Sequence, residues 1–506
     1  MSLWWPICSG CVLCPRERRY RRLQYAGRNA TLESVETTDR KLSLTEKCVG
    51  QSKVFVNRTL NLKKIKYLGL DMDHTLIRYN TENFERLSHT KIIEKLISRK
   101  GYPEQIKKFQ FDFHFALRGL VVDRKKGNLL KLNRYTAIRT SFHGLKPLEF
   151  KTHQKVYKST YIDLSKTDYL AIDTSFSYSL ANAYSQLVDL KDSDPLIKLP
   201  DYAQMADDVL DALDEAHRDG SLKDEVRKNL GEYIIKDEEL VRDLEKFKKH
   251  GKKIFILTNS DFYYSKLLLD YAITPFLKEH KSWVDLFEFV ITFAQKPKFF
   301  YDDLKFLKVD PATGVMTNMD AKLSPGVYQS GNARKFTEDL GLNGDDILYV
   351  GDHIYGDILR LKKDCNWRTA MIIEELDHEI KSNKKNEPTM SEIDSLMRRK
   401  EPFEEELTEL MTKKIEKQFK VDENRIDQLQ DNITEIDTQI SQLIKKQQAL
   451  YNPNWGQLMR AGNEESYFAY QMERYACVYM TQIRDLFELS PRTYFRAPRR
   501  PLSHEV

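Results

Sequence analysis

The sequence predicts an α/β fold: a Rossmann-like core on a parallel sheet, a large inserted α+β cap after the first strand of the site, and a helical C-terminal extension. Short apolar runs alternate with amphipathic helices, which is typical of a parallel sheet. Four of these runs end in polar residues, as strands do when a site lies along one edge of the sheet. Beyond residue 380 the apolar spacing changes to a heptad pattern.

The first strand is the apolar run Tyr67 to Leu70, and Asp71 and Asp73 follow it. Buried parallel strands read as continuous apolar runs, and ligands collect at their carboxyl ends. Two carboxylates this close repel each other, so they favour a bound cation, and oxygen ligands favour Mg²⁺. The alternative is a surface turn with two solvated acids, because Asp-x-Asp is a short pattern.

A long insertion, residues 80–235, separates this strand from the next one. Residues 118–123 and 128–132 are predicted strands, joined by a turn at 125–127. Residues 200–232 carry apolar side chains at three- and four-residue spacing, which predicts a helix. A block of this size after the first strand is a candidate lid over the site.

The α/β pattern resumes after the insertion. Strands are predicted over 252–257, 287–293 and 347–350, with helices between them. Because the carboxyl ends of parallel strands share one edge, their polar residues are expected to meet. Those residues are Thr258, Asn259, Ser260, Lys296, Asp352 and Asp357.

Apolar residues between Ile426 and Leu443 form a heptad seam, which favours a helical hairpin or, alternatively, an intermolecular coiled coil. The predicted organisation follows from these changes in pattern. It comprises a poorly ordered extension (1–52), a catalytic core (53–79 and 236–380), a cap that sets substrate specificity (80–235), and a helical, then aromatic- and arginine-rich region (381–506) packing on the core or a partner subunit.

Composition excludes several classes of protein. The 81 basic and 76 acidic residues give a net charge of only +5, which argues against a nucleic-acid binder. Six cysteines in 506 residues form no disulfide framework and suit a reducing, cytoplasmic location. Without a run of about 18 apolar residues, stable membrane insertion is not expected. The spacing of Cys8, Cys11 and Cys14 leaves metal binding, an acylated anchor and an unstructured extension open.

The residues at the strand ends fit phosphoryl transfer through an aspartate. Asp71 is the candidate nucleophile, because a carboxylate can take up a phosphoryl group and split one hard hydrolysis into two steps. Asp73 can protonate the leaving oxygen and later take a proton from water. Thr258 and Lys296 can hold the phosphoryl oxygens.

The same residues form a predicted metal site. Asp352 would complete a Mg²⁺ shell with Asp71 and the carbonyl of Asp73, while Asp357 would hold the lysine or a metal-bound water. Singly, each residue has a simpler explanation: Thr258 as a helix cap, Lys296 as an exposed lysine, Asp352 as a turn aspartate. Their joint occurrence at four strand ends favours the site.

Four segments, 71–76, 257–260, 295–297 and 351–357, resemble the motifs of the haloacid dehalogenase superfamily, and more closely those of cytosolic purine 5′-nucleotidases. The resemblance implies Mg²⁺-dependent hydrolysis of purine nucleoside 5′-monophosphates, with IMP and GMP preferred. It also implies a homotetramer and a possible nucleotide effector. The family can also pass the phosphoryl group to a nucleoside, so nucleoside phosphotransferase as the main role stays open.

The resemblance extends to substrate-binding residues. Lys223 falls where the family places a phosphate-binding lysine, and Asp214 and His217 fall where it places contacts to the purine; Asn259 and Ser260 are expected at the substrate. Leu210 and Arg218 depart from the family pattern, which has an arginine and a tyrosine there. Base preference therefore stays open.

A different kind of function is a catalytically silent, nucleotide-sensing or interaction member of the family. Such a protein would be expected to have lost at least one of the four central residues. All four are present: Asp71, Asp73, Lys296 and Asp352.

Overall fold

A computed structural model describes residues 53–157, 161–319, 321–416 and 421–505. The chain divides into two units, 1–52 and Lys53–Val506. The predicted N-terminal extension, with Cys8, Cys11 and Cys14, lies outside the described residues. The further division of the second unit into core, cap and C-terminal region stays a prediction in its boundaries.

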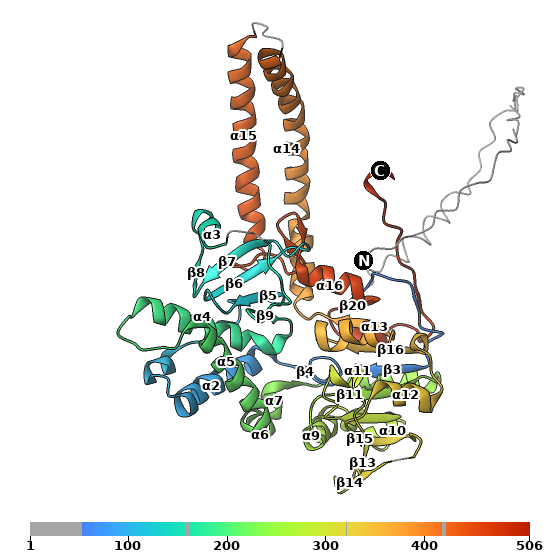
Figure 1. Cartoon of the computed structure of the whole chain (residues 1–506). Coiled ribbons are helices and arrows are strands. Elements are labelled where there is room, and N and C mark those ends of the chain that lie inside the picture. The colour runs from blue at the N-terminus through green and yellow to red at the C-terminus, as the bar shows by residue number, and fades with distance from the viewer. Residues whose placement is uncertain (1–52, 158–160, 320, 417–420, 506) are drawn as a thin grey trace, which may run out of the picture. The chain divides into compact units, whose positions relative to one another are not determined.

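One ten-stranded sheet organises the second unit (Figure 1). Seven neighbouring strands, from β20 to β15, run parallel, and β1, β13 and β14 pair antiparallel with their neighbours. This confirms the predicted parallel sheet. In spatial order the strands are β1 (Val54–Val56), β20 (Val478–Met480), β17 (Arg368–Ile372), β16 (Ile347–Gly351), β3 (Tyr67–Leu70), β11 (Lys253–Leu257), β12 (Phe289–Thr292), β15 (Gly326–Gln329), β13 (Leu307–Val309) and β14 (Met316–Asn318).

Strand β3 is central and buried on both faces. Leu68 and Leu70 pack in one hydrophobic cluster, with helices α8 (Glu238–Lys249) and α9 (Phe262–Ala272). Tyr67 packs in another, with α11 (Lys298–Tyr301) and α12 (Ala333–Leu340). Between them Gly69 leaves room for two aromatic rings, since a Cβ there would lie 2.3 Å from Phe255 and 2.7 Å from Tyr349. Burial on both faces explains why the strand is apolar throughout.

The insertion after β3 begins and ends at one place, where β4 (Arg78–Tyr79) pairs antiparallel with β10 (Ile234–Ile235). It contains a second, antiparallel sheet, in which Gly127 (φ 70°) lies in the predicted turn between the paired strands β5 and β6. The strands are β8 (Lys146–Pro147), β7 (Ile138–His143), β6 (Asn128–Leu132), β5 (Leu120–Asp123) and β9 (Tyr169–Ile172). The α-helices of the insertion that precede residue 200 are α2 (Thr81–Lys100), α3 (Phe150–Val156) and α4 (Tyr178–Ser193).

The single helix predicted over 200–232 is wrong. The structure has α5 (Tyr202–Arg218), α6 (Ser221–Lys228) and α7 (Leu230–Tyr233). The first break comes at Gly220, whose φ of 86° is left-handed and cannot continue a right-handed helix. The apolar spacing continues across the break because α5 and α6 bury neighbouring faces, which concealed the turn in the sequence.

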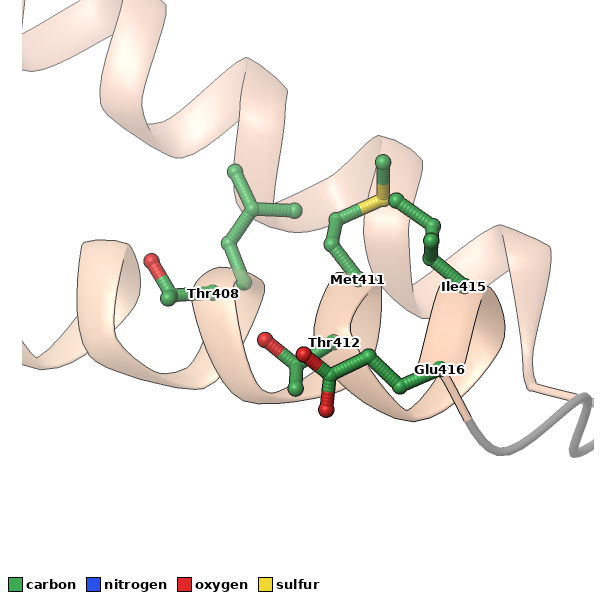
Figure 2. Close-up of a pocket in the computed structure, with 6 residues that line it drawn as sticks. Thr408, Met411, Thr412, Ile415 and Glu416 are labelled. Carbon is green, nitrogen blue, oxygen red and sulfur yellow. The ribbon is translucent and has the colours of Figure 1, made fainter.

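Two long helices, α14 (Leu376–Glu416) and α15 (Glu423–Gln448), lie side by side as a hairpin (Figure 1). Leu396 of α14 packs with Ile436 and Ile440 of α15, so the heptad seam is used within the chain. Near the end of α14, Met411 and Ile415 line a shallow pocket of about 400 Å³ (Figure 2), whose lining comes from this helix alone.

The chain then returns to the main sheet through β20. The remaining strands are β2 (Leu60–Asn61) paired with β21 (Tyr494–Phe495) and β18 (Arg460–Ala461) paired with β19 (Glu464–Glu465). The remaining α-helices are α10 (Trp283–Leu286), α13 (Arg360–Asp364), α16 (Tyr467–Tyr475) and α17 (Arg484–Phe487). Within the described part of the chain, no helix combines the length and apolar character needed to cross a membrane.

Candidate active site

The predicted site residues gather where four adjacent parallel strands end. Asp71 directly follows β3, Thr258 follows β11, and Asp352 follows β16. Lys296 comes four residues after the end of β12. Since β16, β3, β11 and β12 are neighbours in the sheet, these residues share one edge, as the sequence predicted.

Lys296 lies at the centre of the site. Its Nζ is 2.8 Å from Asp71 Oδ1 and 2.7 Å from Asp357 Oδ1, and it donates to the Tyr349 hydroxyl at 3.0 Å. The side chain is only 4% exposed, so the simple alternative of a solvent-exposed lysine is wrong. Burial alone would lower the pKa of Lys296, but Asp357 and Asp71 raise it above its ordinary value, so the amine stays charged.

Three carboxylates surround a point beside this lysine. Oxygens of Asp71, Asp352 and Asp357 lie within 4.8 Å of one another, and Asp352 Oδ2 is buried with no hydrogen-bond partner among the described residues. Burial raises the pKa of Asp71 well above its usual range, with repulsion from the other acids adding to it and Lys296 opposing it. Burial likewise raises the pKa of Asp352 to about 6. Such a cluster fits a hard divalent cation, which would offset the repulsion.

Asp73 lies in a different environment, bonded to hydroxyl groups. Tyr79 donates to Asp73 Oδ1 at 2.7 Å, and Ser260 and Thr258 donate to Oδ2 at 2.7 and 3.4 Å. The hydroxyl of Ser260, which the sequence predicted at the substrate, therefore donates to Asp73. Burial and the Asp73 carboxylate raise the pKa of Tyr79, so its hydroxyl keeps its proton.

Asn259, also predicted at the substrate, ties two loops together. Its Oδ1 accepts from the backbone N–H of Lys296 at 2.6 Å, and its Nδ2 donates to the Lys296 carbonyl at 3.1 Å. This pair of bonds holds the loop after β12 against the loop after β11, and so places the Lys296 side chain.

In the insertion, two of the three predicted residues contact neighbours of the strand-end residues. Lys223 Nζ is 2.5 Å from Asp261 Oδ2, and His217 lies against the ring of Phe176, centroid to centroid 5.8 Å. Burial and then Lys223 lower the pKa of His217 to about 4, so its imidazole is neutral. Asp214 is exposed on α5, and among the described residues no contact joins it to the strand-end residues.

Sequence reasoning missed Arg118, which joins the insertion to the loop after β16, where Asp352 lies. Its guanidinium is 2% exposed and donates to the Asp352 carbonyl at 2.8 Å, to Ser175 Oγ at 2.6 Å and to Glu375 Oε1 at 3.0 Å. These partners lie 57 to 257 residues away in the chain. No local pattern in the sequence could have found them.

A second link between insertion and core was also missed. His353 Nε2, next to Asp352, lies 3.1 Å from Asp173 Oδ1, just beyond β9. Burial would lower the pKa of His353, but Asp173 raises it to about 9, so this is an ion pair at neutral pH. The insertion therefore contacts the loop after β16 twice, through the hydrogen bond from Arg118 to the Asp352 carbonyl and through the Asp173–His353 ion pair.

Comparison with known proteins assigns the family. A model of the 5′ nucleotidase family matches residues 54–506. The chain belongs to that family. Curated relatives agree: a 5′-nucleotidase domain-containing protein of Dictyostelium discoideum is 26% identical over 89% of this chain and 74% of its own length. Human 5′-nucleotidase domain-containing protein 2 is 26% identical over 90% and 85%.

Solved structures give weaker likenesses. A predicted phosphoglycolate phosphatase from Haemophilus somnus is 11% identical, with a TM-score of 0.27, over 61% of this chain and 85% of that one. A β-phosphoglucomutase from Clostridium difficile is 12% identical, with a TM-score of 0.22, over the same shares. The fold assignment therefore rests on the strand order above, and the reaction class on the family: this 5′-nucleotidase-family chain is a phosphoric monoester hydrolase, and its family acts on nucleoside monophosphates.

Proposed function

We propose that this protein is a Mg²⁺-dependent 5′-nucleotidase that hydrolyses purine nucleoside 5′-monophosphates, with IMP and GMP preferred, through an aspartyl phosphate. One observation carries the proposal: two carboxylates two residues apart have different environments. Asp71 faces Lys296 and two further acids, whereas Asp73 faces three hydroxyl groups. Paired acids with divergent surroundings take divergent roles in catalysis.

In the first step, a carboxylate oxygen of Asp71 attacks phosphorus. The bond from phosphorus to the ribose 5′-oxygen breaks, its electron pair stays on that oxygen, and Asp73 supplies the proton. In the second step, water attacks the phosphorus of the aspartyl phosphate and gives its proton to Asp73. The bond to Asp71 breaks, which releases phosphate and restores the carboxylate.

Lys296 and the Thr258 hydroxyl would hold the phosphoryl oxygens during both steps. Asp71, Asp352 and the main-chain carbonyl of Asp73 would hold Mg²⁺, with Asp357 beside them; the unpartnered Asp352 Oδ2 supports this set. Bound there, Mg²⁺ would neutralise charge on the phosphate and the nucleophile. Lys296, whose Nζ is 2.8 Å from Asp71 Oδ1, would neutralise part of the same charge.

The cap would complete the substrate site. We assign Lys223 to the phosphate and His217 to the base, because both lie against neighbours of Asp73 or His74. Asp214 is assigned to a ring N–H of the purine. The proposal also includes a nucleotide effector, a cytoplasmic location and a homotetramer. Light scattering tests the last of these: an active species of about 60 kDa at micromolar concentration would contradict the tetramer.

The deciding experiment measures phosphate release from a panel of nucleoside monophosphates with Mg²⁺ or with EDTA. The proposal expects release from IMP and GMP above AMP and pyrimidine nucleotides, and loss of release in EDTA. Release from none of them, or release that EDTA leaves unchanged, would contradict it. Adding inosine with GMP as donor separates the two uses of the intermediate, since formation of IMP faster than free phosphate would make phosphotransfer the main activity.

A further inference from the structure

Tyr79 stands where the core passes into the insertion. It is the second residue of β4, and its partner across the pair is Ile234 of β10, where the insertion ends. The residue is 2% exposed. Its ring stacks on His74 at 4.8 Å between centroids and meets Phe84 edge-on at 5.2 Å. The phenol is therefore held in place by packing against His74, from the loop after β3, and Phe84 of α2.

The Tyr79 hydroxyl belongs to a hydrogen-bond chain with a defined direction. It lies 2.7 Å from Asp73 Oδ1 and 3.0 Å from the Tyr264 hydroxyl. An ionised carboxylate only accepts, and a phenol has a single proton to give. The proton of Tyr79 is therefore donated to Asp73, and the proton of Tyr264 is donated to Tyr79.

These hydrogen bonds place the two carboxylate oxygens of Asp73 in different surroundings. Oδ1 is held by Tyr79, whose own oxygen is occupied by Tyr264. Oδ2 faces Ser260 and Thr258 at the end of β11, next to the phosphoryl position of the proposed reaction. A hydroxyl such as that of Ser260 can rotate and change from donor to acceptor, so only Oδ2 has neighbours that adapt to a proton.

We propose that Tyr79 is a positioning residue that fixes Asp73, so that Oδ2 gives the proton to the leaving ribose oxygen and later takes one from water. The inference rests on the proposed function, in which Asp73 is the acid and base. Because Tyr79 immediately precedes the insertion, the orientation of the acid depends on the same strand pair that joins the insertion to the core.

The test is Tyr79→Phe, which keeps the ring and removes only the hydroxyl. Two probes differ in their need for an acid: GMP, and its analogue with sulfur in place of the bridging 5′-oxygen, whose thiolate leaves without a proton. Loss of a hydrogen bond to a charged group should lower kcat for GMP by about 10- to 100-fold. For the sulfur analogue kcat should fall less than about threefold, since general acid catalysis contributes little there. KM should change little for either probe.

Two matched variants separate positioning from support of the fold. Tyr233→Phe removes a hydroxyl from another buried tyrosine next to the same strand pair, and it should leave both probes unchanged. Tyr264→Phe removes the donor to Tyr79 and should show a smaller loss with the same dependence on the leaving group. Circular dichroism and thermal unfolding check that each variant is folded.

Equal losses of kcat on the two probes, or no loss on GMP, would overturn the inference. The Tyr79 hydroxyl would then only support the packing at the β4–β10 pair, or would not contribute to turnover. Failure of the proposed function looks different. Wild-type protein that releases phosphate from neither probe, or Asp71→Asn that still turns over both, would overturn the proposed reaction and this inference with it.

Discussion

Two buried carboxylates, Asp71 at the strand ends and Glu85 in the insertion, show how neighbours decide what an acid can do. Asp71 has Lys296 at 2.8 Å and a candidate cation position beside it. Glu85 is fully buried, accepts from the Ser179 N–H at 2.7 Å, and has no lysine or arginine in contact among the described residues. Burial therefore raises the pKa of Glu85 to about 8, and it is protonated at neutral pH. Burial alone would disfavour the charged form of both acids. Of the two, only Asp71 has a positively charged neighbour that opposes this effect.

The largest expected effect comes from removing the acid at the core site. Asp71→Asn should lower turnover of GMP by at least about 10³-fold, because the amide is no longer a nucleophile while the packing is kept. Phosphate release by purified protein, with the amount of folded protein checked by circular dichroism, measures it. Residual activity near wild type, in a preparation free of contaminating phosphatase, would end the aspartyl-phosphate mechanism.

Removing the compensating charge instead should make Asp71 resemble Glu85. Lys296→Met leaves Asp71 and Asp357 facing each other, which raises the pKa of Asp71 further and removes a donor to the phosphoryl group. Turnover should fall by about 10²- to 10³-fold, as for loss of one electrostatic stabiliser. Lys298→Met, an exposed lysine two residues on, is the matched control and should change activity less than twofold. Similar losses in the two variants would mean that the position of Lys296 is not special.

The opposite test replaces Glu85 with glutamine, which is neutral at every pH. The pKa of Glu85 is about 4.5 when unfolded and about 8 when folded, so between these values the folded protein binds a proton that the unfolded chain does not. Stability from this proton is fully present below pH 4.5 and is lost as pH rises through 8. The Glu85→Gln variant has no titratable group at this position, so its stability lacks this dependence on pH.

Between pH 6 and 8.5, the free energy of unfolding of wild type should therefore fall by about 2 kcal/mol more than that of Glu85→Gln. Urea unfolding at each pH measures this difference. Glu82→Gln, an exposed acid on the same helix, should follow wild type. Parallel pH curves for wild type and Glu85→Gln would show that Glu85 has a partner after all.

The same contrast explains what the sequence could predict. The strand-end residues sit in short contiguous segments after apolar runs, so their meeting at one edge follows from the order of a parallel sheet. Glu85 and Arg118 carry no such pattern, because their surroundings are made by segments far apart in the chain. The break at Gly220 was missed for a related reason: apolar spacing reports only which positions are buried, and it continues from α5 into α6 although the two helices pack in different clusters.

The smallest effect is expected at a third carboxylate, the exposed Asp214. Hypoxanthine and guanine carry a donor at N1, whereas adenine presents an acceptor that would face Asp214 unpaired. An exposed carboxylate is free to accept from a ligand, but water competes for it, so the preference for GMP over AMP should be near the low end of the range for a charged hydrogen bond, about tenfold. Asp214→Asn should narrow that ratio of kcat/KM, chiefly by lowering the value for GMP. Asp211→Asn, on the same helix and bonded to Lys100, should leave the ratio unchanged. If Asp214→Asn keeps the full preference, Asp214 is a solvated helix residue and the base contact belongs to His217 or Arg218.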